Sequence, residues 1–236
     1  HTRFALVRGL GDVYKRQAVD LGESLMLLPD EGELPERLLA ALLGEDWSFS
    51  LRSNLQRLQW AASQVRGKLS RENWQALVEL QREAQELDTP EPDFAELLDF
   101  LNRLVMSLAA LSGFALDDMT RDEGWRFLMI GRRIERLQFL SSSLAAFLRG
   151  TAAFDQAGLD WLLELGNSSI TYRSRYLAVA QLIPVLDLLL LDEQNPHAVL
   201  FQLKLVTRTL KRLNDDFGVP RCLLYTSDAA DEGLGV

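Results

Sequence analysis

One segment near the middle of the chain, residues 120–150, constrains the fold more than any other. It is typical of a single long helix, because Thr120 and Glu123 have the spacing of a capping box and Gly150 follows Arg149 as a helix end. At about 100° per residue, its apolar side chains fall on two roughly opposite faces. The first face carries Trp125, Leu128, Met129, Phe139, Leu140 and Phe147, and the second carries Phe127, Ile130, Ile134, Leu137 and Leu148. A helix with two apolar faces needs neighbours on both sides, which predicts a bundle built around it.

The rest of the chain also has helical periodicity broken by turn signals, and we find no convincing strand. A short helix is predicted over 34–43, with Pro35 in its first turn and Gly44 at its end. Further helices are predicted from a cap at Ser48 or Ser50 to about 69, from a cap at Ser70 to about 87, and from a capping box at 93–96 to about 114. After the central segment come a short helix with Trp161, a helix over 168–176 and a last helix that is capped by Asn195 and begins at Pro196. Pro184 should break or kink the chain between them. The sequence therefore predicts an all-α multi-helix bundle, and we expect it to be incomplete at its N-terminus.

Both ends of the chain resemble translated sequencing-library adapter. The codons of one adapter strand encode Asp12 to Gln17, and those of the other strand fit the run that starts at Cys222. We therefore expect 1–17 and 222–236 to be adapter-derived tails, 18–221 to be the folded domain, and the whole to be a metagenomic fragment. The only cysteine would be lost with the tail, which fits a reducing, cytoplasmic compartment.

Charge and residue types narrow the classes of function. A net charge of −9 argues against nucleic acid or an anionic membrane surface as the main partner, and no apolar run looks long enough to span a bilayer. With His1 in a tail, His197 is the only histidine of the expected domain, so no zinc or di-iron motif can be built. We expect neither a metal nor a cofactor.

Arg132 and Arg136 project from the middle of the first apolar face of the central segment, and Glu135 projects from the edge of that face. Charges on an apolar face are rarely left unpaired, so one interpretation is a buried ion-pair network that fixes how the helices meet. The other is an anion or carboxylate site, with two guanidinium groups directed into one pocket and oriented by Glu135. Mutually satisfied charges would indicate structure, and unpaired guanidinium groups in a cleft would indicate a site.

A second polar and aromatic group comprises Tyr172, Arg175 and Tyr176. The two tyrosines are four residues apart and share a helix face. They are either core tyrosines with satisfied hydroxyl groups or part of the pocket that contains Arg132 and Arg136.

The stretch 125–136 resembles the signature of the bacterial alpha-E family, all-helical domains named for a Glu-Arg motif, and 65–74, 168–176 and 190–196 agree with it. The resemblance covers most of 48–213. It maps the Glu-Arg motif onto Glu135 and Arg136, preceded by Trp125, Gly131 and Arg132. Two features depart from the family: an opening helix with an earlier Glu-Arg motif is missing, and His197-Ala198 replace a more usual Arg-Ser, so His197 receives no role.

The resemblance also implies partners. Alpha-E domains often occur beside, or fused to, a circularly permuted ATP-grasp domain and near transglutaminase-like proteins. We therefore expect a non-catalytic helical accessory domain in a system that makes or modifies peptide or amide bonds. The alternative is an enzyme, in which Arg132, Arg136 and Tyr176 bind an anionic substrate and Glu135 is the general base.

Overall fold

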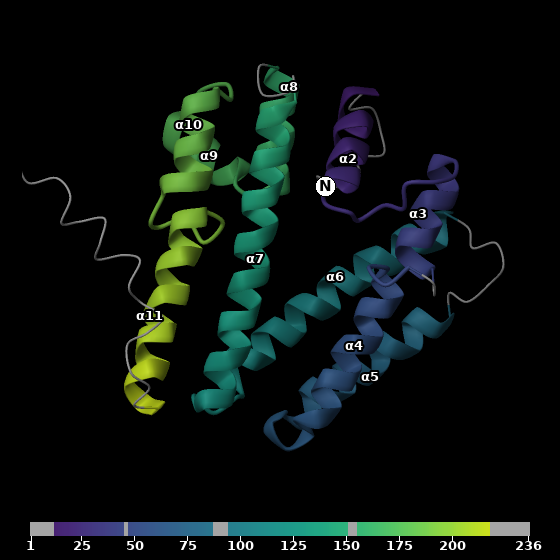
Figure 1. Ribbon diagram of the computed structural model, residues 1–236, viewed down its shortest axis with the longest axis vertical. Coiled ribbons are helices and arrows are strands. Elements are labelled where there is room, and N and C mark those ends of the chain that lie inside the picture. The colour runs from purple at the N-terminus through teal and green to yellow at the C-terminus, as the bar shows by residue number, and fades with distance from the viewer. Residues whose placement is uncertain (1–11, 45–46, 87–93, 151–154, 218–236) are drawn as a thin grey trace, which may run out of the picture.

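The computed structural model describes residues 12–44, 47–86, 94–150 and 155–217. Over these ranges it contains helices and no strand, so the all-α prediction is confirmed (Figure 1). Of the expected adapter-derived ends, 1–11 and 222–236 lie outside the described residues, together with His1 and Cys222. Residues 12–17 form the first turns of a helix.

The first half of the chain forms helices that pack on one another in sequence. They are α2 (Asp12–Ser24), α3 (Leu34–Leu43), α4 (Leu51–Gln64), a 3₁₀ turn (Arg66–Lys68), α5 (Arg71–Glu86) and α6 (Phe94–Asp117). Two predicted caps are confirmed: the hydroxyl of Ser50 accepts from Ser53 N at 3.2 Å, and that of Ser70 accepts from Asn73 N at 3.1 Å. Helix α4 ends earlier than predicted, because the chain turns through the 3₁₀ segment before Leu69.

The central helix is α7 (Glu123–Arg149), which ends at Gly150 as predicted. Its start differs from the prediction, since the capping residue is Asp122 and not Thr120. The Asp122 carboxylate accepts a hydrogen bond from Trp125 N at 3.0 Å and pairs with Lys68. A carboxylate is favoured over a hydroxyl here because it also complements the positive end of the helix dipole.

The second half comprises α8 (Gln156–Leu165), α9 (Ser169–Tyr176), α10 (Leu182–Leu186), the π-helical turn η3 (Asp187–Leu191) and α11 (Val199–Phe217). Pro184 does not break a helix, contrary to our prediction. The chain has already left α9 at Leu177, whose φ of 49° is left-handed. Pro184 then lies in the first turn of α10, where no backbone N–H is needed.

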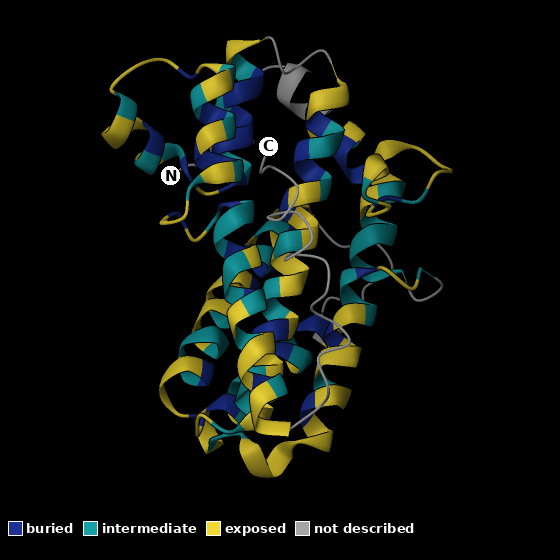
Figure 2. Cartoon of the chain, turned by 60° about the vertical axis from the view of Figure 1, so that its left-hand side comes forward, coloured by how far each residue is buried: buried dark blue, intermediate teal, exposed yellow. Residues whose placement is uncertain are grey.

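The described residues form three hydrophobic clusters. One joins α2, the end of α7, and α8 to η3, with Val185 and Leu188 fully buried. A second lies among α3, α4, α5 and α6 around Phe100. A small third cluster joins the end of α6 to the start of α7 through Ala115 and Met129. Figure 2 shows the buried residues concentrated in the part of the chain that holds the first cluster.

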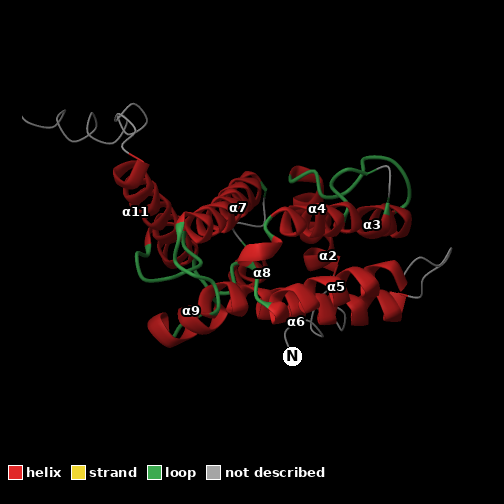
Figure 3. Cartoon of the chain, turned by 90° about the horizontal axis from the view of Figure 1, so that it is seen from below, coloured by secondary structure: helices red, strands yellow, loops and turns green. Residues whose placement is uncertain are grey.

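Helix α7 lies between α11 on one side and the α4–α6 group on the other (Figure 3). Its first apolar face is buried at Met129, Leu140 and Phe147, whereas Leu128 and Phe139 on the same predicted face are each 38% exposed. Its second face is covered only in part by the described residues, since Phe127 is 58% exposed and Ile134 46%. The ring of Phe127 lies beside that of Phe217 at the end of α11, with centroids 6.5 Å apart.

Helix α6 corrects one prediction about membranes. By length and composition alone, its 24 residues are apolar enough to cross a bilayer, and it is the one such helix in the described part of the chain. A single helix of this kind is weak evidence, because core helices of soluble proteins pass the same test. In this structure α6 packs along α5, and Arg103 on α6 pairs with Glu83 on α5.

Candidate anion-binding site

Three arginines on one segment of α7 form the most unusual charged group in the structure. We call Arg132, Arg133 and Arg136 the arginine cluster. Arg132 Nη2 donates to the hydroxyl of Ser112 on α6 at 2.9 Å, and Arg133 Nη1 donates to Gln202 Oε1 on α11 at 3.4 Å. The cluster therefore lies where α7 meets both of its neighbours.

The charges of the arginine cluster are not neutralised by carboxylates in the described structure, where none of the three forms an ion pair. Burial lowers the pKa of Arg132, and the charge of Arg136 lowers it further. Burial also lowers the pKa of Arg133, with added repulsion from Arg132 and Arg136. Arg132 and Arg133 are half-buried, whereas Arg136 is exposed. An anion beside these mutually repelling guanidinium groups would relieve the repulsion and replace the hydration that Arg132 and Arg133 have lost.

Glu135 does not belong to this cluster. It is exposed, and among the described residues it forms no ion pair. It lines a different cavity of about 520 Å³, together with Leu25, Gln138 and Arg149. The buried Arg-Glu network considered from the sequence is therefore not formed by Glu135.

Replacing Glu135 with alanine should change the free energy of unfolding by less than about 0.5 kcal/mol, because exposed side chains without partners contribute little. Chemical denaturation of the two proteins measures this directly. A loss of about 3–5 kcal/mol, the cost of stranding a buried charge, would contradict the exposed placement.

His197 is a member of the site that the sequence did not reveal. It is half-buried, its Nε2 lies 3.4 Å from Asn167 Nδ2, and burial followed by the charge of Arg136 lowers its pKa. No local signal marked it, because its proximity to Arg136 arises only when α11 packs against α7. The imidazole therefore reports on the electrostatic state of the arginine cluster.

The lowered pKa of His197 gives a pH dependence with a definite sign. As the pH falls below ~6.5, His197 takes up a proton in the unfolded chain before it does so in the folded protein. The free energy of unfolding should therefore decrease as the pH falls from about 6.5 through the lowered pKa of the folded state. Urea denaturation between pH 8 and 5 measures the effect as the difference from His197→Gln. Arg136→Gln should raise the pKa of His197 in an NMR titration, and an unchanged pKa would show that the two groups are far apart.

Asn195 holds His197 in place. Its Nδ2 donates to Ser168 Oγ at 3.1 Å and to the Leu188 carbonyl at 3.0 Å, while its Oδ1 accepts from His197 N at 3.0 Å. Asn195 is 4% exposed and Ser168 fully buried. We predicted Asn195 as the cap of the last helix, but that helix begins at Val199, and Asn195 instead joins three separate segments.

Tyr172, Arg175 and Tyr176 are bonded to other partners and are not brought to the arginine cluster. Tyr172 is 1% exposed, and its hydroxyl donates to the Val179 carbonyl at 3.2 Å and accepts from Gln181 N at 3.0 Å. Its ring lies 4.8 Å from that of Tyr176. Of the two interpretations of Tyr172, a core tyrosine with a satisfied hydroxyl describes these contacts.

The other two residues of this group point to the chain beyond α10. The Tyr176 hydroxyl donates to Asp187 at 3.0 Å, and burial together with this bond raises the pKa of Tyr176. Arg175 pairs with Asp192. Burial would raise the pKa of Asp192, but hydrogen bonds from Gln194 N and Arg175 outweigh it and lower the pKa. These contacts fasten α9 to η3 and the loop after it.

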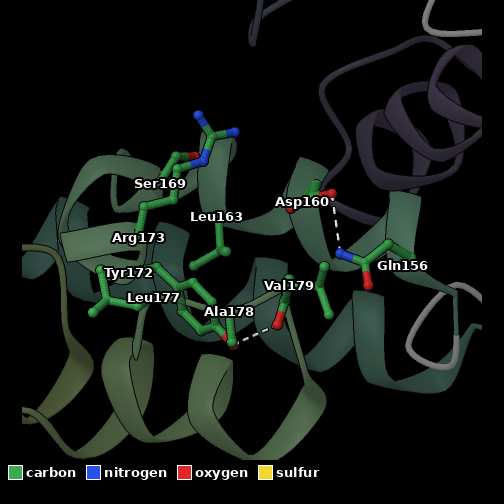
Figure 4. Close-up of a pocket in the computed structure, with 10 residues that line it drawn as sticks. Gln156, Asp160, Leu163, Ser169, Tyr172, Arg173, Leu177, Ala178 and Val179 are labelled. Carbon is green, nitrogen blue, oxygen red and sulfur yellow. Dashed lines mark hydrogen bonds between the residues drawn. The ribbon is translucent and has the colours of Figure 1, made fainter. Parts of the chain in front are cut away.

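A cavity of about 390 Å³ lies beside Tyr172, and it includes Arg173 rather than Arg175 or Tyr176. Figure 4 shows Arg173 and Asp160 on different sides of this cavity, with Gln156 hydrogen-bonded to Asp160. Because Arg173 is exposed and forms no ion pair among the described residues, we regard this cavity as secondary to the arginine cluster.

Trp125 and Gly131, the remaining residues of the predicted site, differ in role. The Trp125 Nε1 donates to the Ala115 carbonyl at 2.9 Å, and the Arg121 guanidinium lies 4.4 Å from its ring centroid, so Trp125 anchors α7 to α6. Gly131 is exposed, and a Cβ added there would meet nothing within 4 Å in the described structure. The described residues give no packing reason for a glycine at this position.

No group of three or more histidine, cysteine, aspartate or glutamate residues is placed to hold a metal ion in the described ranges.

One comparison with known protein families identifies a family. Residues 15–224 match the Alpha-E family, described as a predicted alpha-helical domain with a conserved ER motif. The chain is 31% identical over 193 residues to uncharacterized proteins of Mycobacterium tuberculosis and Mycobacterium bovis. The aligned region covers 79% of this chain and 22% of each relative, so the chain spans about a fifth of the length of the curated relatives it matches. No solved structure matches it.

Proposed function

Since this chain belongs to the Alpha-E family, we propose that it is a non-catalytic helical domain that binds an acidic substrate through its arginine cluster and presents it to an ATP-grasp partner. The partner, a circularly permuted ATP-grasp protein or fused domain, would form or modify a peptide or amide bond. A transglutaminase-like protein is a further proposed partner. The proposed setting is the bacterial cytoplasm, where the ATP for such a reaction is available.

The observation that supports this proposal is that the three arginines have no carboxylate partner among the described residues. Within the described structure Arg132 and Arg133 donate to neutral partners, Ser112 and Gln202, and none of the three arginines pairs with a carboxylate. Guanidinium groups recognise carboxylates through paired, charge-assisted hydrogen bonds. A carboxylate-rich peptide would supply the negative charges that pair with the arginine cluster.

The accessory role is supported by the lengths of the relatives. The aligned region is 22% of each mycobacterial protein, so this kind of domain occurs there as one part of a much longer chain. A domain that binds substrate beside other domains fits that arrangement.

The enzyme alternative finds less support in the geometry. Its proposed base, Glu135, is exposed and lines a different cavity from Arg132. Its proposed third binding group, Tyr176, donates to Asp187 at the start of η3. A general base must come within hydrogen-bond reach of the substrate that the binding groups hold, and these residues do not share a cavity.

Binding of tetraglutamate tests the anion site. We expect calorimetric titration to show binding that weakens as salt is raised. Arg133→Gln combined with Arg136→Gln should weaken it about 10- to 100-fold, because hydrogen bonds to charged groups contribute about 1.5–3 kcal/mol. Arg149→Gln is the matched control, as it removes the same charge from the last turn of the same helix.

The partnership is tested by mixing the domain with an ATP-grasp protein encoded beside it. We expect co-purification, ATP turnover by the mixture in the presence of acidic peptide, and no turnover by the domain alone. Turnover by the isolated domain that is abolished by Arg132→Ala or Glu135→Ala would refute the accessory role and favour the enzyme alternative.

A further inference from the structure

An apolar cleft lies beside the arginine cluster, between α7 and the α4–α6 group. Its volume is about 540 Å³, which is within the range of small-molecule sites. Helices α4, α5, α6 and α7 all contribute to its wall. The apolar lining includes Leu58, Val65, Leu77, Leu111, Met119 and Leu128.

The cleft is elongated along α7. Gly124, Leu128 and Arg132 line it from that helix at intervals of four residues, so they share one face. Eight residues of α-helix correspond to about 12 Å, which sets the approximate length of this wall. Arg132 therefore lies at one end, and the start of α7 lies at the other.

The two cations in the wall differ in their partners. Lys68 pairs with Asp122, the capping residue at the start of α7, so its charge is already compensated. Arg132 is held by the neutral hydroxyl of Ser112, which itself donates to the Leu108 carbonyl at 2.8 Å. The uncompensated positive charge is thus confined to the Arg132 end of an otherwise apolar cleft.

Asn73 is a second polar group in the wall. It is 4% exposed and lines the cleft, and its side-chain amide has no hydrogen-bond partner in the described structure. Its backbone N–H alone is bonded, to Ser70. The side-chain amide of Asn73 can therefore form a hydrogen bond with a polar group of a ligand in the cleft.

We propose that this cleft binds an elongated apolar carboxylate, with the carboxylate at Arg132 and the apolar body along Leu128 and Leu77 towards Asn73. The proposal rests on the proposed function, because it requires Arg132 to be an anion-binding group, and it specifies that the acidic substrate carries a long apolar portion. Burying that portion contributes roughly 25 cal/mol per Å², while the neighbouring arginines repel a cationic head group.

Decanoate is the probe, with acetate and decyltrimethylammonium as controls for the head group and the chain. We expect decanoate to bind at least tenfold more tightly than either control, measured by calorimetry and by protection against thermal unfolding. Arg132→Gln should weaken decanoate binding tenfold or more, and Arg149→Gln should leave it unchanged. Ala61→Trp, which places a large ring in the cleft from α4, should abolish it.

The contrary outcomes separate this proposal from the previous one. Equal binding of decanoate and decyltrimethylammonium, or an unchanged affinity in Arg132→Gln, would overturn the carboxylate assignment. If tetraglutamate binds and decanoate does not, the cleft proposal fails and the proposed function stands. A partner protein that shields the cleft under those conditions would show that a protein segment occupies it. If neither ligand binds, both proposals fail.

Discussion

Phe100→Ala should lower the free energy of unfolding by about 3–5 kcal/mol, the cost of removing a fully buried aromatic side chain. Phe100 is 2% exposed at the centre of the cluster among α3, α4, α5 and α6. Its buried neighbours in this cluster are Leu55, Leu80, Ala84, Leu97 and Leu104, so the substitution leaves a cavity in an aliphatic core.

Chemical denaturation followed by far-UV circular dichroism measures this loss, and Phe49→Ala is the matched control. Phe49 is 54% exposed, so its removal should cost much less. A similar loss for both variants would contradict the placement of Phe100 in a core.

Asn195→Ala should cost about 1–3 kcal/mol, although it removes only a small polar side chain. The substitution removes the side-chain donor to the buried Leu188 carbonyl, and an unsatisfied buried polar group costs about that much. The Ser168 hydroxyl loses the same donor but keeps its hydrogen bond to the Gly166 carbonyl. The substitution also frees His197 N, so the imidazole should move away from Arg136 and its pKa should rise towards 6.5.

Denaturation measures the stability of Asn195→Ala, and an NMR titration of His197 measures its pKa. Asn214→Ala is the matched control, because Asn214 is only partly buried on α11 and has no hydrogen bond among the described residues. Equal stability of the two variants would show that the Asn195 network contributes nothing.

The helices could be predicted from the sequence wherever their ends carry local signals. Pro35 and Gly44 mark α3, and Ser50 and Ser70 precede α4 and α5, so these starts were confirmed. Where two caps compete, as at Thr120 and Asp122, local spacing could not decide between them, because Lys68 selects Asp122 through a contact between distant segments. The left-handed turn at Leu177 had no signal, since neither glycine nor asparagine occupies that position.

The grouping of the site residues could not be predicted from the sequence, because it depends on how α7 packs against its neighbours. The motif predicted Arg132, Glu135 and Arg136 as one group, but the rotation of α7 about its axis decides which of them face a neighbour. Packing against α6 and α11 half-buries Arg132 and Arg133 and leaves Glu135 exposed. The packing of α11 against α7 brings three further residues to the site, which are Arg133, Asn195 and His197.

The length of α7 has a mechanical consequence. Its 27 residues correspond to about 40 Å, with Met129 packed in one hydrophobic cluster and Phe147 in another. A rigid helix that is packed into a separate core near each end moves as one body, and the turn with Arg132 and Arg133 lies between these two cores. Tilting α7 at either end changes the distances from this turn to Ser112 and Gln202. An anion bound at this turn and a partner bound at one end of α7 would therefore change each other's affinity. By thermodynamic linkage, the two changes in affinity would be equal.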